Sequence, residues 1–121
     1  MVATDSTAPL TARSGTLQTY NAAVDLIERN FAVRPEKIAY IDDYGAYTYA
    51  ELARRVNRCA NALTGLGLAL EARVLLCLTD TVDFPSVFLG AIKAGIVPVA
   101  VNTSLTRGEY DFMFRDSFFK F

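Results

Sequence analysis

The 121-residue sequence predicts an α/β fold built around a parallel βαβ unit. Two short apolar runs, residues 73–78 and 96–101, flank a helix-compatible stretch at residues 84–94. Val- and Leu-rich runs of this length are typical of strands that are covered on both faces. A strand, a helix and a strand in about thirty residues ordinarily close as a right-handed crossover between parallel strands.

The central helix has specific start and stop signals. Asp83 is predicted as its N-cap, Pro85 suits the first turn, and Gly95 can adopt the left-handed conformation that ends a helix. Lys93 is the only charge between Asp83 and Gly95, so the apolar arc is wider than a surface helix needs. We therefore expect neighbours to cover this helix on more than one side. The residues of the arc are Val87, Phe88, Leu89, Ala91 and Ile92.

Pro98 lies inside the second predicted strand. Because proline has no N–H, it fits a strand only where that donor would have no partner.

Two further elements precede this unit. Residues 21–30 predict a helix capped by Asn21, with Val24, Ile27 and Phe31 on its inward face. Residues 37–48 predict a hairpin whose turn contains Gly45 at a position that requires positive φ.

Two capping boxes mark the remaining helices. Thr48 with Glu51 begins a helix over residues 49–64, which Gly65 and Gly67 end; Leu52, Val56, Cys59 and Leu63 should face inward. Thr106 with Glu109 begins a helix over residues 107–115.

The composition excludes several classes of protein. Twelve basic and thirteen acidic residues give a net charge of −1, so the chain lacks the excess of basic residues that is typical of nucleic-acid-binding proteins. No apolar run reaches the length of a membrane span, and no secretory signal is evident, so the default expectation is the cytoplasm. Cys59 and Cys77 have apolar neighbours and are interpreted as small core residues rather than a disulfide. Without histidine, a zinc or haem site has few ligands.

Few side chains suggest catalysis. The sequence contains no glycine-rich phosphate loop after a strand, and no nucleophile has a base within its motif. Asp80 and Asp83 follow the first parallel strand, at the edge where α/β sheets bind ligands, but a capping residue and a solvated residue explain them more simply. Arg54, Arg55 and Arg58 could form an anion patch, but we interpret them as a solvated helix face offset by nearby acids. A ligand-stacking surface is an alternative for Tyr40, Tyr44, Tyr47 and Tyr49, which we interpret as cross-strand packing.

Four stretches, residues 21–23, 38–63, 73–95 and 96–106, resemble in order the beginning of the acyl- and aryl-CoA ligases of the adenylate-forming superfamily. The motifs general to it are Thr48-Tyr49-x-Glu51-Leu52, Asn57-Arg58 and Lys93-Ala94-Gly95. Residues 80–85 and 88–92 resemble the benzoate-CoA ligase branch in particular. The resemblance extends over residues 20–117.

The resemblance implies a two-step ligase that takes an aromatic carboxylate as its substrate. ATP and Mg²⁺ activate the acid as an acyl-adenylate, and CoA then displaces AMP. In that family the phosphate loop, the acyl pocket and the catalytic lysine come after the matched region, so no catalytic residue or metal ligand is expected here. We expect this chain to be an incomplete N-terminal subdomain that is inactive alone.

The resemblance also suggests one binding loop. Some relatives carry a basic residue after the Val-Pro strand, where it meets the phosphates of CoA. Ser104 stands at that position here, and Arg107 follows three residues later. These two residues are the only candidate cofactor contacts.

The expected organisation is a flexible leader at residues 1–19, a partial AMP-binding ligase domain at 20–117 and an atypical aromatic tail at 118–121, with Phe118, Phe119 and Phe121. An alternative is a free-standing interaction module that docks through the apolar helix and this tail. Exposed apolar surface would also favour self-association.

Overall fold

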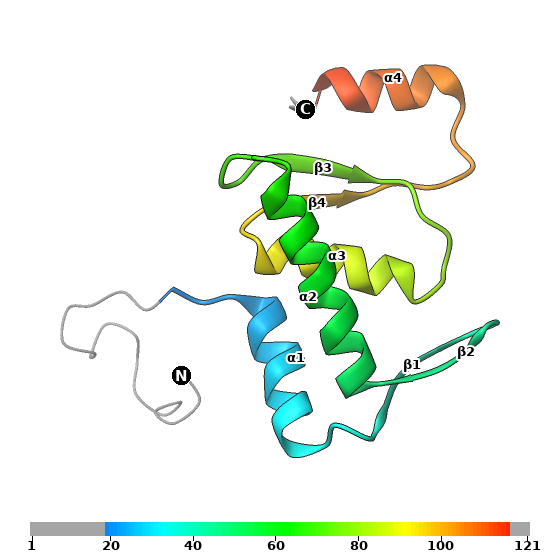
Figure 1. The fold of residues 1–121 in the computed structure, drawn as a ribbon. Helices are drawn as coiled ribbons and strands as arrows, with labels where there is room; N and C mark the ends of the chain where they lie inside the picture. The colour runs from blue at the N-terminus through cyan, green and yellow to red at the C-terminus, as the bar shows by residue number, and fades with distance from the viewer. Residues whose placement is uncertain (1–18, 117–121) are drawn as a thin grey trace.

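A computed structural model describes residues 19–116 of the chain (Figure 1). Each predicted element is present, and the α/β class is confirmed. The predicted tail at 118–121 and nearly all of the predicted leader lie outside the described residues. The elements are α1 (Ala22–Val33), β1 (Ile38–Asp42), β2 (Gly45–Thr48), α2 (Tyr49–Gly65), β3 (Arg73–Leu76), α3 (Asp83–Lys93), β4 (Val97–Ala100) and α4 (Arg107–Asp116).

The strands β3 and β4 pair in parallel, with Arg73 opposite Val97, and α3 forms the crossover between them. The Val97 N–H donates to the Ala72 carbonyl at 2.8 Å, and the Val101 N–H donates to the Leu76 carbonyl at 3.0 Å. Since successive residues of a strand direct their amides to opposite sides, the nitrogen of Pro98 faces away from β3. The prediction for Pro98 is confirmed.

The strands β1 and β2 form an antiparallel hairpin that projects beside the first turns of α2 (Figure 1). Tyr40 lies opposite Tyr47 across the hairpin, and both side chains pack against the hydrophobic core cluster, which agrees with a packing role. Tyr44, at the tip, is 83% exposed. Gly45 has a φ of +156°, which agrees with the predicted need for glycine.

The predicted helix caps are largely confirmed. The Asn21 side chain accepts the amides of Ala23 and Val24, and Thr48 with Glu51 forms the reciprocal capping box. At the other ends, Gly67 and Gly95 have φ values of +73° and +77°.

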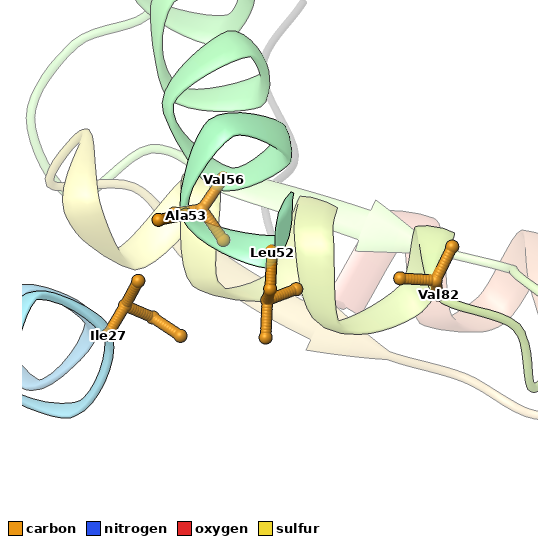
Figure 2. Packing of buried hydrophobic residues seen from close by; sticks show 5 residues of the cluster. All are labelled: Ile27, Leu52, Ala53, Val56 and Val82. Carbon is orange, nitrogen blue, oxygen red and sulfur yellow. The ribbon is translucent and has the colours of Figure 1, made fainter. Parts of the chain in front are cut away.

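The hydrophobic core lies where α1, α2 and the start of α3 meet. Figure 2 shows its residues, which converge from these three segments. Val56 is 1% exposed and is the largest of the fully buried side chains. The cluster comprises Ile27, Leu52, Ala53, Val56 and Val82.

The helices α2 and α3 pack closely because α3 presents small residues to α2. Gly90 is buried, and a Cβ there would lie 2.6 Å from the Cβ of Cys59 and 3.1 Å from the backbone nitrogen of Ala60. Ser86, one turn earlier, is also buried, and its hydroxyl donates to the Val82 carbonyl at 2.6 Å. The face of α3 toward α2 is therefore set by small side chains, which the sequence analysis did not identify.

The apolar arc of α3 receives cover from several directions, as predicted. The helix packs against α1 and α2 and against the strands β3 and β4. Its large side chains Val87, Phe88, Leu89 and Ile92 nevertheless remain only half-buried.

Three local predictions were wrong. Asp83 does not cap α3: Val82 occupies the N-cap position in helical conformation, and Asp83 is the first helical residue. Phe31 is 45% exposed, because α1 is buried against its neighbours through Ala23 and Ile27 and this ring lies at the margin of that contact. Cys77 is exposed rather than buried, because β3 ends at Leu76; both cysteines are free, as expected.

Candidate functional site

The carboxyl ends of β3 and β4 lie at the same edge of the sheet because the strands are parallel. Ligands of open α/β sheets bind at this edge. The loop after β3 contains Cys77 and Asp80, and the loop after β4 contains Asn102 and Ser104. This edge of the sheet is therefore the candidate functional site.

Tyr110 of α4 joins the two loops. Its hydroxyl donates to the Asn102 carbonyl at 2.7 Å and lies 3.4 Å from the Cys77 sulfur. The hydrogen bond with Cys77, together with desolvation, raises the pKa of Tyr110. Tyr110 is not predicted from the sequence, since a helical tyrosine gives no local signal.

Ser104 and Arg107, the predicted cofactor contacts, both lie exposed in and after the β4–α4 loop. The Ser104 amide donates to Asn102 Oδ1 at 2.9 Å, which forms the turn, and Arg107 is the first residue of α4. Within residues 19–116 no side chain pairs with the Arg107 guanidinium. The loop thus presents a hydroxyl and a cation to solvent, and their contact with CoA stays a prediction.

The second capping box fixes where α4 begins. The Glu109 carboxylate accepts the Thr106 amide and hydroxyl, both at 2.7 Å, and the Glu109 amide donates back to the Thr106 hydroxyl at 3.4 Å. The bond from the Thr106 amide lowers the pKa of Glu109. The predicted capping box is confirmed, and it fixes the end of the loop that contains Ser104.

The two aspartates after β3 are already engaged by protein groups. The Tyr40 hydroxyl donates to Asp80 Oδ1 at 2.8 Å, and this bond raises the pKa of Tyr40. Asp83 Oδ1 lies 3.6 Å from Arg55 of α2. Both carboxylates connect this loop to its neighbours, which agrees with a structural interpretation.

Asp42, at the end of β1, is a residue that the sequence analysis missed. Its Oδ2 accepts the Val82 amide at 2.8 Å, and its Oδ1 accepts the amides of Tyr44 and Gly45. Desolvation acts to raise the pKa of Asp42, but these amides and the charge of Arg55 lower it overall. The carboxylate fixes the hairpin turn and attaches the hairpin to the start of α3.

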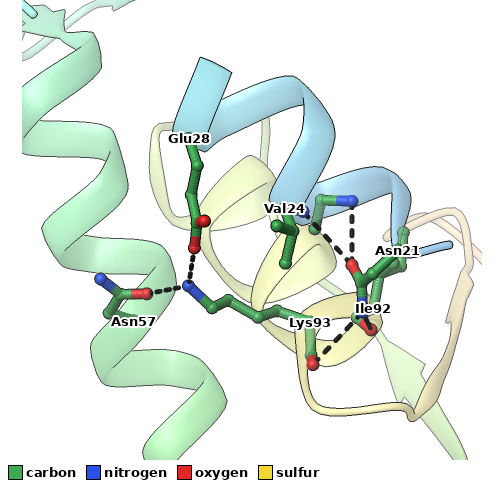
Figure 3. A network of polar contacts seen from close by, with 7 residues as sticks. Asn21, Val24, Glu28, Asn57, Ile92 and Lys93 are labelled. Atoms are coloured by element: carbon green, nitrogen blue, oxygen red, sulfur yellow. Dashed lines mark hydrogen bonds and ion pairs between the residues drawn. The ribbon is translucent and has the colours of Figure 1, made fainter. Parts of the chain in front are cut away.

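Two motifs of the family resemblance meet in the structure. Figure 3 shows that the Lys93 ammonium extends from α3 to Glu28 of α1 and Asn57 of α2, at 2.7 and 2.6 Å. Asn21 adds a second connection, since its Nδ2 donates to the Ile92 carbonyl at 2.9 Å while its Oδ1 caps α1. These residues hold three helices together.

The described residues offer no metal centre and no membrane span. No group of three or more Cys, Asp or Glu side chains in residues 19–116 is arranged to hold a metal ion. In the same range, no helix is both long and apolar enough to cross a bilayer.

A family model described as "AMP-binding enzyme" matches residues 27–121. The chain belongs to the AMP-binding enzyme family. Over 100 residues it is 60% identical to the benzoate–CoA ligase of Thauera aromatica, covering 81% of this chain and 19% of that protein. It is 50% identical over 102 residues to the 4-hydroxybenzoate–CoA/benzoate–CoA ligase of Rhodopseudomonas palustris, covering 84% of this chain and 19% of that one.

The fold agrees with a solved member of the family. A benzoate CoA ligase from Burkholderia xenovorans LB400 superposes with a TM-score of 0.79 at 46% identity, covering 84% of this chain and 20% of that one. The chain thus spans about a fifth of the length of these relatives. The predicted resemblance to the N-terminal part of benzoate-CoA ligases is confirmed.

Proposed function

We propose that this chain forms part of the N-terminal domain of an aryl-acid CoA ligase of the benzoate type. The whole enzyme would activate an aromatic carboxylate with ATP, releasing pyrophosphate, and transfer the acyl group from AMP to the thiol of CoA. The observation that carries this proposal is the 60% identity to a benzoate–CoA ligase over 100 residues. Because the relatives compared above are ligases by name, they favour this function over an interaction module.

The contribution of residues 20–117 to such an enzyme is that of a scaffold. Lys93, Asn57 and Glu28 connect α3, α2 and α1, and Asp42 attaches the hairpin to the same unit. A site that must hold reacting groups in fixed geometry depends on rigid supporting elements. We assign that supporting role to this unit.

The described residues supply neither ligands for the metal of the reaction nor a loop that could hold a triphosphate. Mg²⁺ prefers several oxygen ligands, and no suitable carboxylate group exists in residues 19–116. The sequence also has no glycine-rich loop after a strand that could hold a triphosphate. We therefore assign no chemical step to this chain.

CoA is the cofactor that these residues could still contact. Ser104 is exposed in the loop after β4, and Arg107 is exposed at the start of α4. Among residues 19–116 the Arg107 guanidinium has no partner, and such a group suits the phosphates of CoA. Replacing Arg107 by Gln in the chimaera described next should raise the KM for CoA and leave ATP–pyrophosphate exchange unchanged.

The test is a chimaera in which residues 20–116 replace the aligned segment of a benzoate–CoA ligase. We expect benzoate-dependent release of pyrophosphate from ATP to persist. A matched chimaera with the aligned segment of a long-chain fatty-acid ligase shows how much activity the shared fold alone retains. If the first chimaera is folded but no more active than the second, a benzoate-type origin is contradicted.

The isolated chain provides the complementary measurement. Purified residues 1–121 should release no pyrophosphate from ATP in the presence of benzoate, since the sequence has no phosphate loop and residues 19–116 hold no group of metal ligands. Carboxylate-dependent turnover by this chain would overturn the proposal. The expectation that the enzyme is cytoplasmic is part of the same proposal.

A further inference from the structure

A small polar pocket lies where the hairpin meets the first turns of α2. Its volume is about 190 Å³, and its lining residues are Tyr47, Glu51, Arg54, Arg55 and Arg58. This space equals roughly six water molecules at about 30 Å³ each, so it admits a small ion or the end of a larger ligand. It lies on different elements from the Ser104–Arg107 loop.

The pocket has an excess of positive charge that α2 does not balance. Glu51 is the only acidic residue of this helix, and its Oε2 accepts the Thr48 amide at 2.8 Å within the capping box. Arg54 and Arg58 are exposed and have no ion-pair partner within residues 19–116. An ordinary solvated helix face would instead alternate charges of both signs at spacings of three or four residues.

Arg55 is the ordered member of the group. Its guanidinium lies 5.1 Å from the centroid of the Tyr47 ring, in a cation–π contact. Its Nη1 also lies 3.6 Å from Asp83 Oδ1, which partly balances its charge. One guanidinium is therefore held in place beside two that remain available.

Repulsion between the arginines destabilises the protein when no anion is bound. Arg54 and Arg58 are four residues apart on one helix, and like charges at that spacing repel each other by a few tenths of a kcal/mol. An anion with several oxygens would remove the repulsion and accept paired N–H groups, which guanidinium groups offer in a planar fork.

We propose that Arg54, Arg55 and Arg58 form a binding site for a small phosphate-bearing anion. The Glu51 carboxylate in the lining opposes an anion, but its bonds to Thr48 direct it toward the N-cap. This proposal does not depend on the ligase function, because its evidence is the local charge and geometry.

The experiment titrates the full chain with inorganic phosphate, pyrophosphate and AMP against sodium chloride of equal ionic strength. The signals to follow are the arginine Nε–Hε and Tyr47 amide resonances in ¹⁵N–¹H NMR spectra. We expect saturable shifts with a Kd of about 1 mM or tighter for at least one phosphate compound. If AMP has a Kd no lower than that of phosphate, the inorganic ion alone accounts for binding. If AMP has the lower Kd, the ligand is a nucleotide. Either outcome supports the site.

Variants assign the binding to this pocket. Replacing Arg54 and Arg58 together by Gln should weaken phosphate binding at least tenfold, whereas Arg29→Gln, which removes a cation paired with Asp25 on α1, should leave it unchanged. The Gln pair should also melt at a higher temperature than wild type in chloride, because the repulsion is gone. Shifts that follow ionic strength alone, or equal weakening by Arg29→Gln, would overturn the proposal.

Discussion

The Lys93 ammonium lies 2.6 Å from Asn57 Oδ1 and 2.7 Å from Glu28 Oε1. One side chain of α3 therefore bridges α2 and α1 at once, and its side chain is 26% exposed. Asn57 and Lys93 belong to two of the motifs that indicate the family. In this structure these two motif residues join helices and take part in no chemical step.

Removing the ammonium should loosen the three-helix unit. We expect Lys93→Met, which keeps the aliphatic stem, to lower the free energy of unfolding by about 1 kcal/mol, because two charge-assisted hydrogen bonds are lost at a partly exposed site. Urea denaturation measures the change. Arg115→Gln is the control, since its pair with Asp111 is largely exposed, and it should shift stability by less than about 0.5 kcal/mol.

Gly90 determines how closely α2 and α3 approach. Gly90→Ala should destabilise the protein by about 1–3 kcal/mol, because the new methyl group meets the Cβ of Cys59 and the backbone of Ala60 and Val56. Gly108→Ala, in α4 with no atom within 4 Å, should instead stabilise by roughly 0.5–1 kcal/mol through helix propensity. Thermal unfolding of both variants checks the opposite signs. Equal effects would contradict the close packing described here.

Asn21 serves two helices with the two ends of one amide. Asn21→Ala should cost about 1 kcal/mol through loss of the α1 cap. Asn21→Asp keeps the cap acceptor but loses the donor to the Ile92 and Lys93 carbonyls and sets a negative charge against them. If the contact with α3 matters, the Asp variant is less stable than wild type; if only the cap matters, it is equally stable.

Asp42 should make stability depend on pH in the acid range. Its folded-state pKa is below the ordinary value of about 3.9, so its contribution is present above that pH and is lost as the pH falls through the lower, folded-state pKa. Glu109 acts in the same direction. Urea midpoints of wild type should fall on acidification, and Asp42→Asn should be less stable at neutral pH with a smaller fall. An unchanged slope in the variant would exclude Asp42 as a contributor.

Exposed apolar side chains should make the isolated chain associate. Ile41, Leu66 and Leu70 are each more than 70% exposed, and Val33 is 73% exposed. We expect the chain to bind dyes that report apolar surface and to sediment as more than a monomer at high concentration. A monomer that binds no such dye and unfolds in one sharp, cooperative thermal transition would contradict this prediction.

Local signals predicted the elements well because their causes lie within a few residues. The Thr48–Glu51 box, the Asn21 cap and the positive φ of Gly95 each need only neighbouring groups. The start of α3 was mispredicted for the opposite reason. The Val82 amide is satisfied by Asp42, forty residues earlier, and no local pattern reveals that partner.

The candidate sites show the same division. The exposure of Ser104 and Arg107 agrees with their loop position, whereas Tyr110 was missed because its partners Cys77 and Asn102 come from two other segments. The arginines of α2 were interpreted as a solvated face. The structure instead leaves Arg54 and Arg58 without an ion-pair partner among residues 19–116, which no local pattern indicates.

The alternation of amide direction along β4 has a consequence for isotope exchange. The amides of Val97 and Val101 are bonded to β3, and within the described residues no third strand pairs with the outer edge of β4. Deuterium should therefore replace the proton of Ala100 quickly while Val97 and Val101 retain theirs, and Pro98 contributes no signal. If another polypeptide completed the sheet on that side, Ala100 would become slow, so one amide reports whether the edge is open.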